Sequence, residues 1–417
     1  MAKPKIRFKG YQDDWEQRKA IDIADYLKGN GYSKGDLTDA GTPIILYGRL
    51  YTKYQFAISE VDTFAVPRNG AVYSQGNEVI VPASGETAED IARASAVEKS
   101  GVLLGGDLNI LRPFDFINPL FLALAISNGE PQKELAKKAQ GKSVVHIHNT
   151  DIQEVTIAYP SRTEQDRIVS VFCNLDHLIT LHQRKCEETK KLKKFMLQKM
   201  FPQNGSLVPE IRFDVFTDDW EQRKLEDLCE LITKQTGFDY AASIKPALIT
   251  DRKDDTYSFI QNKDFCGNDI NMNTDFYIPV EVAERFPKIL LDKPSVLISI
   301  SGRIGNVGFY KLQEKAFIGG AVGICKLRDA EEGEFIIQEL ESEYGQKYFK
   351  SLIKASSHAN ITVEDIRNIE LQFPKEEQEK RKISDIMSNL DHLITLHQQK
   401  CDDLKNLKKY MLQNMFI

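Results

Sequence analysis

The chain has 417 residues, a formal net charge of −6, 41% hydrophobic residues and 28% charged residues. This length suits two or three domains, and this composition is typical of a soluble globular protein. The sequence has no run of 18 apolar residues and no apolar stretch after Met1, so we expect neither a membrane span nor a secretory signal. The acidic balance argues against a protein that binds DNA alone, unless positive charge is concentrated locally or a partner supplies it.

The six cysteines are scattered and form no CxxC pair. They indicate reduced cytosolic thiols and argue against both a disulfide framework and a zinc ribbon.

Near its start the chain carries a motif that returns 205 residues later. PKIRFKGYQDDWEQRK begins at Pro4 and PEIRFDVFTDDWEQRK begins at Pro209, with 11 of 16 positions identical. We call these two stretches the Trp motifs and expect the tryptophan of each to be buried by packing. After each motif we expect a short helix, at Trp15–Tyr26 and at Trp220–Ile232.

Two longer segments, Leu27–Tyr159 and Thr233–Phe373, differ in sequence but share landmarks in the same order. Short β-rich runs between Gly and polar turns indicate a mixed α/β domain with an irregular sheet in each segment. The matching landmarks include Val79–Val81 with Val296–Ile298, Ser84–Glu86 with Ser301–Arg303, Gly141–Ile147 with Ala355–Ile361, and Asp151-Ile152 with Asp365-Ile366. Helices are expected at Asn118–Ser127, Glu130–Ala139 and Phe335–Ala355.

Each segment ends in a charged connector that begins with proline, and a long helix follows it. Asn174–Phe201 and Asn389–Phe416 are identical at 21 of 28 positions, at an offset of 215 residues. Within these helices neither Pro nor Gly interrupts the pattern, and steps of three and four residues predict a heptad seam. The predicted seam is Leu175, Leu178, His182, Lys185, Thr189, Leu192, Met196 and Lys199, paired with Leu390, Leu393, His397, Lys400, Leu404, Leu407, Met411 and Asn414. Its polar centre, formed by His182, Lys185, His397 and Lys400, is predicted to set the register of the helix pair.

The sequence contains no catalytic constellation that we can defend. It lacks a GxxxxGK(S/T) phosphate loop and a GxGxxG turn after a strand. Asn118–Phe121 lacks the second Pro of the amino-methyltransferase box. His146 and His148 alternate on one strand face, but no third ligand is near, so we favour two strand histidines over a metal site.

The remaining chemistry is suited to recognition. Arg49–Tyr54 interleaves basic and aromatic residues, which fits phosphate contact and base stacking, although a solvated strand end would look the same. The Ser-Gly loops allow close backbone approach, and Arg303 could read guanine with two hydrogen bonds. In each half a basic helix face leads into a polar loop, although such a face is more often simply solvated. The candidate DNA-contacting residues are Arg49, Tyr51, Lys53, Tyr54, Ser84, Gly85, Lys142, Ser143, His146, Ser301, Arg303, Lys354, Ser356, Ser357, His358 and Asn360.

The duplicated order of these motifs resembles the specificity subunit of bacterial type I restriction–modification systems over nearly the whole chain. The resemblance rests on the Trp motifs, Gly41–Pro43 with Tyr47–Tyr51, Ile80–Thr87 with Asp90-Ile91, Gln140–His146, and the twin helices. Two small departures occur: the second connector is longer, and Lys293–Val296 stands where the family commonly has Gly-Asp before the strand.

The resemblance implies an α/β (α+β) fold with two tandem target recognition domains of mixed irregular sheets, two long antiparallel coiled-coil helices between them, and a pseudo-twofold internal repeat. The expected divisions are residues 1–160 and 203–374 for the Trp motifs with their recognition domains, and 161–202 and 375–417 for the helices. It further implies a non-catalytic reader of a bipartite, asymmetric DNA site in a cytoplasmic bacterial or archaeal complex.

The implied partners are double-stranded DNA, two methyltransferase subunits and restriction subunits, and no membrane. The methyltransferase subunits use S-adenosylmethionine to methylate adenine, the restriction subunits use ATP and Mg, and this chain binds no cofactor itself. We assign the exposed lysines of the first long helix, Lys190, Lys191, Lys193 and Lys194, to partner subunits or to the DNA backbone.

Two other functions stay open at this stage. A coiled-coil scaffold without a DNA role is disfavoured because two diverged domains stand beside near-identical helices, and an enzyme is disfavoured by the missing motifs. If the helix pair sets the distance between two readers, then one heptad inserted into both helices is expected to lengthen the unread spacer of the site.

Overall fold

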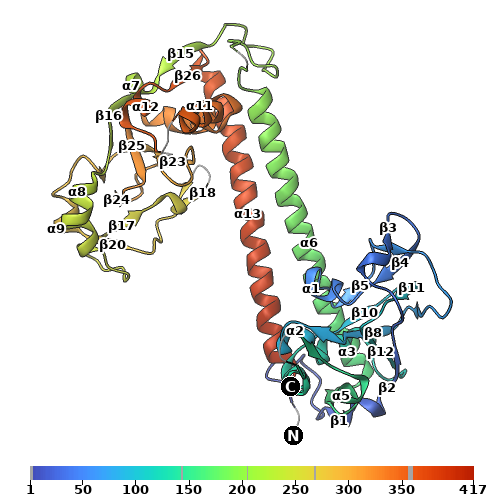
Figure 1. Ribbon diagram of the computed structural model, residues 1–417. Helices are drawn as coiled ribbons and strands as arrows, with labels where there is room; N and C mark the ends of the chain where they lie inside the picture. The colour runs from blue at the N-terminus through green and yellow to red at the C-terminus, as the bar shows by residue number, and fades with distance from the viewer. Residues whose placement is uncertain (1–2, 142–143, 204, 267–268, 356–359) are drawn as a thin grey trace. The chain divides into compact units, whose positions relative to one another are not determined.

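The computed structural model describes residues 3–141, 144–203, 205–266, 269–355 and 360–417. The chain forms two compact units, Met1–His182 with Gln399–Ile417 and Gln183–Gln398. Each unit contains one mixed α/β domain and a part of both long helices, α6 (Arg162–Lys199) and α13 (Glu377–Met415) (Figure 1). The expected mixed α/β class with two domains and two long helices is confirmed. The division at residues 160, 202 and 374 stays a prediction, because compactness groups part of each helix with a domain. In the described ranges no helix is long and apolar enough to cross a membrane.

The first unit is built on two five-stranded sheets. One has the order β2 (Ala24–Lys28), β12 (Leu108–Pro113), β8 (Glu78–Pro82), β10 (Ser95–Val97) and β5 (Ala57–Ile58). The other has the order β3 (Leu37–Thr38), β6 (Phe64–Ala65), β4 (Thr42–Ile45), β11 (Ser100–Leu104) and β7 (Tyr73–Gln75). The unit's shorter helices are α1 (Arg49–Thr52), α2 (Ala88–Ile91), α3 (Pro119–Ile126), α4 (Gly129–Lys138) and α5 (Asn149–Gln153).

The second unit repeats the central arrangement. Its main sheet has the order β16 (Cys229–Lys234), β25 (Val322–Leu327), β22 (Ser295–Ser299) and β23 (Val307–Tyr310). The three strands β16–β25–β22 are antiparallel neighbours, as are β2–β12–β8 of the first unit. A second sheet follows the order β20 (Tyr277–Pro279), β17 (Thr256–Ile260), β24 (Ala316–Ile318) and β21 (Leu290–Leu291), and a ribbon joins β18 (Phe265–Cys266) to β19 (Asp269–Ile270).

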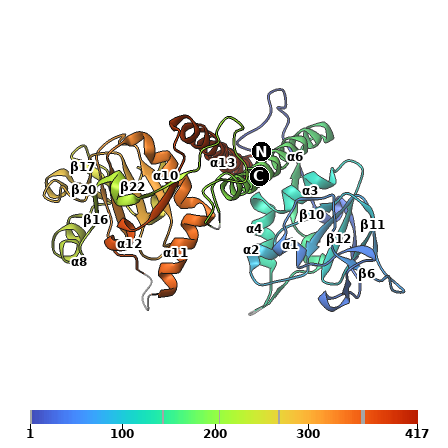
Figure 2. The same ribbon diagram turned by 90° about the horizontal axis from the view of Figure 1, so that it is seen from above.

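The helices expected in the variable segments are largely confirmed. α3 and α4 match the first two, and α10 (Gly333–Glu341) and α11 (Glu343–Ala355) fill the third, beside the main sheet of the second unit (Figure 2). The third helix is broken at Ser342, which has ψ of 166° and accepts a hydrogen bond from the Gly345 N–H through Oγ at 3.3 Å. This buried serine therefore caps a new helix instead of continuing the old one. The unit also has α7 (Leu225–Leu228), α8 (Gly237–Asp239), α9 (Val280–Ala283) and α12 (Val363–Arg367).

The helices expected at Trp15–Tyr26 and Trp220–Ile232 are wrong over most of their length, because both Trp motifs end in a strand. Only a short helical segment follows each strand, Ala20–Asp22 in the first unit and α7 in the second. β1 (Glu16–Lys19) pairs with β14 (Thr156–Tyr159), and β15 (Glu221–Lys224) pairs with β26 (Glu370–Phe373), both antiparallel. Hydrogen bonding to a distant strand overrides the weak helical preference of these charged residues. The predicted packing of the two tryptophans is confirmed, since Trp15 is 4% exposed and Trp220 is 1% exposed.

The same buried ion pair ties each Trp motif to the start of a long helix. The Arg7 guanidinium donates to both carboxylate oxygens of Glu164, at 2.7 and 2.8 Å. Arg212 makes the identical pair of bonds to Glu379, also at 2.7 and 2.8 Å. Both glutamates are 1% exposed, so each arginine neutralises a carboxylate that would otherwise be buried alone. This explains why the arginine of the Trp motif recurs together with the tryptophan.

In each unit, segments of α6 and α13 pack against the same core as the domain. Phe172 and Leu175 of α6 join Met415 of α13 in the first unit, and Leu197 of α6 joins Met387 of α13 in the second. The rings at the ends of the long helices follow the same pattern: Phe416 packs on Phe121, and Phe201 packs on Trp220 and Phe335.

The predicted seam is correct at alternate positions and wrong at those between them. Leu178, Lys185, Leu192 and their counterparts Leu393, Lys400 and Leu407 are exposed. Of the residues that follow them, Ile179, Cys186, Lys193 and Cys401 are buried, and Ile394 and Lys408 are partly buried. Two heptad frames fit this helix, and both contain Leu175, His182, Thr189 and Met196. After each of these positions the next seam residue lies four residues further along the chain, whereas we expected it three residues further. Lys185 and Lys400 thus lie outside the seam, while His182 and His397 are partly buried.

A cross-helix ion pair occurs in each unit at equivalent positions. Lys408 pairs with Asp176 at 2.5 Å in the first unit, and Lys193 pairs with Asp391 at 2.7 Å in the second. Lys408 lies 215 residues after Lys193, and Asp391 lies 215 residues after Asp176. The two ion pairs therefore use matching positions of the repeat, with the two helices exchanged. Lys193 also contacts Glu341 of α10 at 2.5 Å and is 8% exposed, so it belongs to the interior and not to the charged outer face. Burial opposes its charge, but the two carboxylates prevail and raise its pKa.

We expect the buried carboxyl of Glu339 in α10 to make the stability of the second unit depend on pH. One carboxylate oxygen accepts the Gln372 N–H at 3.0 Å, and burial raises the pKa of this carboxyl to about 8 from its ordinary 4.5. Between these values the unfolded chain releases a proton that the folded chain keeps, so stability falls as pH rises, by at most about 1.4 kcal/mol per pH unit. We expect Glu339→Gln to remove this loss, which makes the variant increasingly more stable than its parent from pH 5 to pH 8.

Urea unfolding followed by Trp220 fluorescence in a Trp15→Phe background measures this, because the chain has two tryptophans and Trp220 alone would then report on the second unit. A stability difference that stays constant between pH 5 and pH 8 would contradict the prediction.

Candidate nucleic-acid interface

In the first unit, the Ser-Gly turn after β8 meets the loop that precedes α5. β9 (Ser84–Gly85) pairs antiparallel with β13 (Val145–His146), which sets Ser84 opposite His146. The Ser84 Oγ lies 3.2 Å from the His146 Nδ1, and the imidazole is exposed. Two landmarks that are far apart in the sequence thus form one small surface.

The second unit brings the matching landmarks together in the same way. Ser301 follows β22 and forms an antiparallel bridge with Asn360, and the Ile361 N–H donates to the Ile300 carbonyl at 2.9 Å. Asn360 is exposed at the place that His146 occupies in the first unit. At this bridge the two units therefore present different side chains, His146 and Asn360, at matching positions of the repeat.

The short helix after each loop is fixed by a capping box. Asp151 accepts the His148 N–H at 2.7 Å before α5, and Asp365 accepts the Thr362 N–H at 2.8 Å before α12. A carboxylate at this position satisfies a backbone donor that the helix start leaves open. In the repeated Asp-Ile landmark the aspartate thus caps the helix and the isoleucine is buried in the core. Both residues hold the loop in place.

The basic residues of α1 are held by carboxylates of the same unit. The Arg49 guanidinium donates to Asp62 at 2.6 Å and to the Glu60 carbonyl at 2.8 Å, and its side chain is 9% exposed. Lys53 shares the same carboxylate at 2.6 Å, and hydrogen bonds from Lys53 and Arg49 lower the pKa of Asp62. Of the two, only Lys53 keeps an exposed side chain that could meet a phosphate.

One aromatic residue of this stretch, Tyr51, supports the Ser-Gly turn. The Tyr51 hydroxyl donates to the Ser84 carbonyl, and burial raises the pKa of this phenol. Arg93 lies over the Tyr51 ring at 6.0 Å and over the Tyr54 ring at 5.3 Å, within cation–π range. A Cβ on Gly85 would lie 2.9 Å from the Tyr51 hydroxyl, so a larger residue does not fit there. Tyr51 thus positions the turn, whereas the Tyr54 hydroxyl hydrogen-bonds to the Ala94 carbonyl and to Ser127, both at 3.2 Å. Direct stacking of either ring on bases stays a prediction.

Arg303 differs from these residues because it is exposed and makes no ion pair within the described ranges. The loop behind it is held by side chains: Asn262 donates to the Ser301 carbonyl at 3.2 Å, and Gln346 donates to the Gly305 carbonyl at 3.0 Å. Gly302 and Gly305 have φ values of 73° and 79°, which favour glycine. The loop therefore presents a free guanidinium on a fixed backbone.

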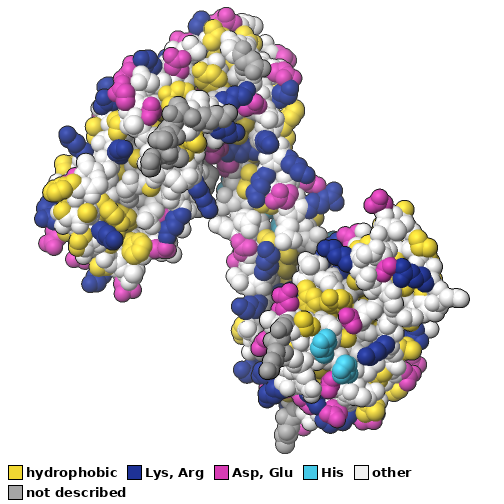
Figure 3. Space-filling model, in the orientation of Figure 1, with side chains coloured by type: hydrophobic (Ala, Val, Ile, Leu, Met, Phe, Trp, Pro, Cys, Tyr) yellow, Lys and Arg dark blue, Asp and Glu magenta, His cyan; other side chains and the backbone are white. Residues whose placement is uncertain are grey.

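The basic helix faces before the recognition loops are partly neutralised. Lys133 pairs with Glu130 at 2.7 Å, Lys138 with Glu154, and Lys347 with Glu343 at 2.9 Å. In the described part of the chain, Lys137 and Lys350 are exposed and have no ion pair. Basic, acidic and hydrophobic side chains are interspersed over the surface shown in Figure 3.

Some predicted residues lie outside the described ranges, namely Lys142, Ser143, Ser356, Ser357 and His358. Lys354 belongs to α11, and its side chain is likewise outside the described part. Where the chain is described, no group of three His, Cys, Asp or Glu side chains comes together in a way that could hold a metal ion.

Sequence reasoning missed the residues that fix the loops, chiefly Arg93, Asn262 and Gln346. Each acts on a loop far away in the sequence, so neither spacing nor periodicity pointed to it. Only the Arg93 contact had a local signal, because Asp90 lies three residues before it and pairs with it.

Comparison with known proteins agrees with this geometry. The family model for the type I restriction modification DNA specificity domain matches residues 12–191 and 217–406. The type I restriction enzyme MjaVIII specificity subunit of Methanocaldococcus jannaschii is 20% identical, over 96% of this chain and 91% of that protein. The putative MjaX specificity subunit of the same organism is 24% identical, over 96% and 92%.

Solved structures show the same fold. The S subunit of a type I restriction–modification system from M. genitalium aligns with a TM-score of 0.66 and 16% identity, over 100% of this chain and 99% of that one. A chain from a study of complex assembly in the type I system aligns with a TM-score of 0.52 and 15% identity, over 96% and 97%. Because the family model covers most of the chain in two copies, this protein belongs to the family of type I restriction–modification DNA specificity subunits.

Proposed function

We propose that this chain is the non-catalytic DNA sequence-recognition subunit of a type I restriction–modification complex. It reads a bipartite, asymmetric site, with one half read by each unit. The observation that carries this proposal is the repeated meeting of the Ser-Gly turn with the loop before a capped helix. The bridge joins matching residues in both units, but the exposed side chains differ.

The differences at matched positions predict two unlike half-sites. His146 stands where the second unit has Asn360, and Glu86 stands where it has Arg303. Asparagine and arginine are the residues that most often read adenine and guanine in the major groove, whereas a carboxylate accepts from cytosine. Different side chains on equivalent loops therefore select different bases.

The chemistry of the complex is assigned to partner subunits. Methyltransferase subunits would bind S-adenosylmethionine and methylate adenine at N6, and restriction subunits would bind ATP and Mg. The acidic balance of this chain fits such a division, because partners would complete the basic surface around the DNA.

The long helices carry a second apolar stripe that the chain itself leaves exposed. Leu178, Leu407 and Tyr410 are exposed in the first unit, and Leu192, Phe195, Leu393 and Leu396 are exposed in the second. Each lies one residue before a position of the buried frame, so these residues form a stripe beside the seam on each helix. Leu178 corresponds to Leu393, Leu192 to Leu407, and Phe195 to Tyr410. We assign this stripe to two methyltransferase subunits, because two equivalent partners need two equivalent apolar surfaces.

We expect Leu407→Glu with Tyr410→Glu to remove one methyltransferase subunit from the complex. Leu192→Glu with Phe195→Glu changes the same two positions in the other unit and should remove the other subunit. Loss of two apolar side chains that the methyltransferase subunit would cover should weaken binding roughly 100-fold, and both double changes together should release both subunits. Native mass spectrometry counts the subunits, and circular dichroism checks that the helices persist. Two subunits still bound to the fourfold variant would contradict this assignment.

The reading function is tested by methylome sequencing of a host that expresses this chain with its methyltransferase partner. We expect methylated adenines in a sequence of two unlike halves separated by an unread spacer. His146→Ala is expected to relax the first half alone, and Asn360→Ala the second half alone, since each side chain stands at the reading loop of its own unit.

Each of these variants is the control for the other, because the two positions are matched. A methylation pattern that does not depend on this chain would refute the proposed function. A half-site that responds to both changes would refute the assignment of one half to each unit.

A further inference from the structure

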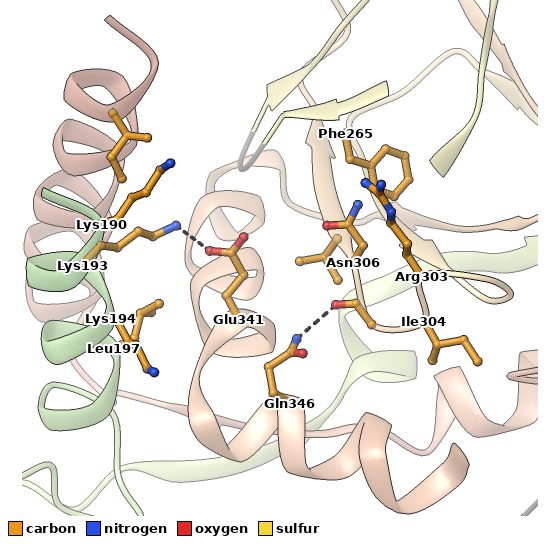
Figure 4. A pocket seen from close by; sticks show the side chains of 13 residues that line it. Lys190, Lys193, Lys194, Leu197, Phe265, Arg303, Ile304, Asn306, Glu341 and Gln346 are labelled. Atoms are coloured by element: carbon orange, nitrogen blue, oxygen red, sulfur yellow. Dashed lines mark hydrogen bonds and ion pairs between the residues drawn. The ribbon is translucent and has the colours of Figure 1, made fainter. Parts of the chain in front are cut away.

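A groove of about 600 Å³ lies within the second unit, between α6 and the loop that carries Arg303 (Figure 4). Lys190, Lys193 and Lys194 line it from α6, and Phe265, Arg303 and Ile304 line it from the opposite side. Its size is that of a site for a ligand or for a short stretch of a polymer.

Three cationic groups in this groove are available to a ligand. The fourth, Lys193, is held by Glu341 and Asp391. Among the described residues Lys194 and Arg303 have no ion pair, and both are exposed. Lys190 pairs with the exposed carboxylate of Glu187, at 3.4 Å, and such a surface pair contributes little. A concentration of uncompensated positive charge in a chain of net charge −6 indicates an anionic partner.

The polar neighbours in the groove are already used by the fold. The Gln346 amide donates to the Gly305 and Leu340 carbonyls, both at 3.0 Å, and the Asn306 amide donates to the Asn262 carbonyl at 3.2 Å. These amides hold the Arg303 loop in place and are not free to bind a ligand. The groups left for a ligand are positively charged side chains on a fixed backbone. Such groups suit phosphates better than a ligand that needs many directed hydrogen bonds.

The charge of the groove is not repeated in the first unit. Lys190 and Lys194 correspond to Lys405 and Lys409, but Arg303 corresponds to Glu86. A surface for a partner that binds twice should recur with the same charge in both units, as the apolar stripe of the helices does. The groove therefore suits the asymmetric ligand of the complex, which is its DNA.

We propose that Lys190 and Lys194 of α6, together with Arg303, hold the phosphate backbone of the target duplex, so that the scaffold helix itself contacts DNA. This inference rests on the proposed function. Arg303 lies two residues after Ser301, which bridges to Asn360, so one loop joins the reading position to the groove. Phe265 and Ile304 give the groove an apolar wall against which the sugars can pack.

The test compares Lys190→Gln with Lys194→Gln, as a double variant, to the unaltered chain in the complex with its methyltransferase partner. Two duplexes of equal length are used, one with the sequence methylated in the host and one unrelated. Loss of two phosphate contacts should reduce the slope of log affinity against log salt by about 2. At physiological salt, the affinity for both duplexes should fall roughly 5- to 30-fold, while the methylated sequence stays the same.

Two controls accompany this variant. Lys190→Arg with Lys194→Arg keeps the charge and should keep the slope. Lys245→Gln with Lys288→Gln removes the same charge from exposed lysines of the same unit that do not line the groove, and it should leave the slope unchanged.

An unchanged slope in the first double variant, or an equal loss in the Lys245 and Lys288 control, would overturn the inference. Loss of methyltransferase binding without a change in the slope would also overturn it, because the groove would then serve the partner. If the unaltered complex shows no preference for the methylated sequence, the proposed function itself fails, which is a distinct result.

Discussion

The pairing of α6 with α13 is the constraint on which the rest of the structure depends. Each unit takes a part of both helices into its core, so neither domain is complete without them. Apolar packing alone leaves the register of such a pair weakly specified, because neighbouring heptads look alike. The cross-helix pairs Asp176–Lys408 and Lys193–Asp391 add a specific charge contact in each unit. In the second unit, Glu341 links this contact to the domain through α10.

The repeated elements and the diverged residues of this chain have different roles. The repeated elements are the Trp motif with its Arg–Glu pair, the capping box, the seam and the exposed apolar stripe. The first three hold the fold together, and the stripe is the surface that we propose for the methyltransferase subunits. The divergent residues are those that the repeated frame presents, such as His146 and Asn360. An invariant frame with variable contact residues is what a reader of two different sequences needs, because the frame sets distance and the side chains set identity.

Much of this arrangement could be predicted because the two halves of the sequence repeat the same motifs in the same order. The burial of Trp15 and Trp220 and the matched Ser-Gly turns followed from letters that recur at fixed offsets. The sequence did not show which of the two heptad frames forms the seam. The exposed frame contains the apolar residues Leu178 and Leu192, whereas the buried frame contains Cys186 and Lys193. Burial of Lys193 makes sense only with two carboxylates from distant segments, and sequence spacing does not show these.

The strands at the end of the Trp motifs and the partners of Arg49 escaped prediction for the same reason. β1 and β15 form by pairing with strands that lie far along the chain. Asp62 forms ion pairs with Arg49 and Lys53, which the sequence had suggested for contact with DNA. Tyr51 supports the Ser-Gly turn, and DNA contact by the predicted site residues stays a prediction. The groove in the second unit needed the structure, because α6 and Arg303 are brought together only by folding.

The central claim is that each unit reads its own half-site on an interchangeable frame. It is tested most directly by a chain in which residues 233–373 are replaced by a second copy of residues 27–159. The helix ends that support the domains are equivalent, since Met200 and Phe201 correspond to Met415 and Phe416. Methylome sequencing of a host that carries this chain should show the first half-site in both positions of the methylated sequence. Persistence of the second half-site would contradict the claim.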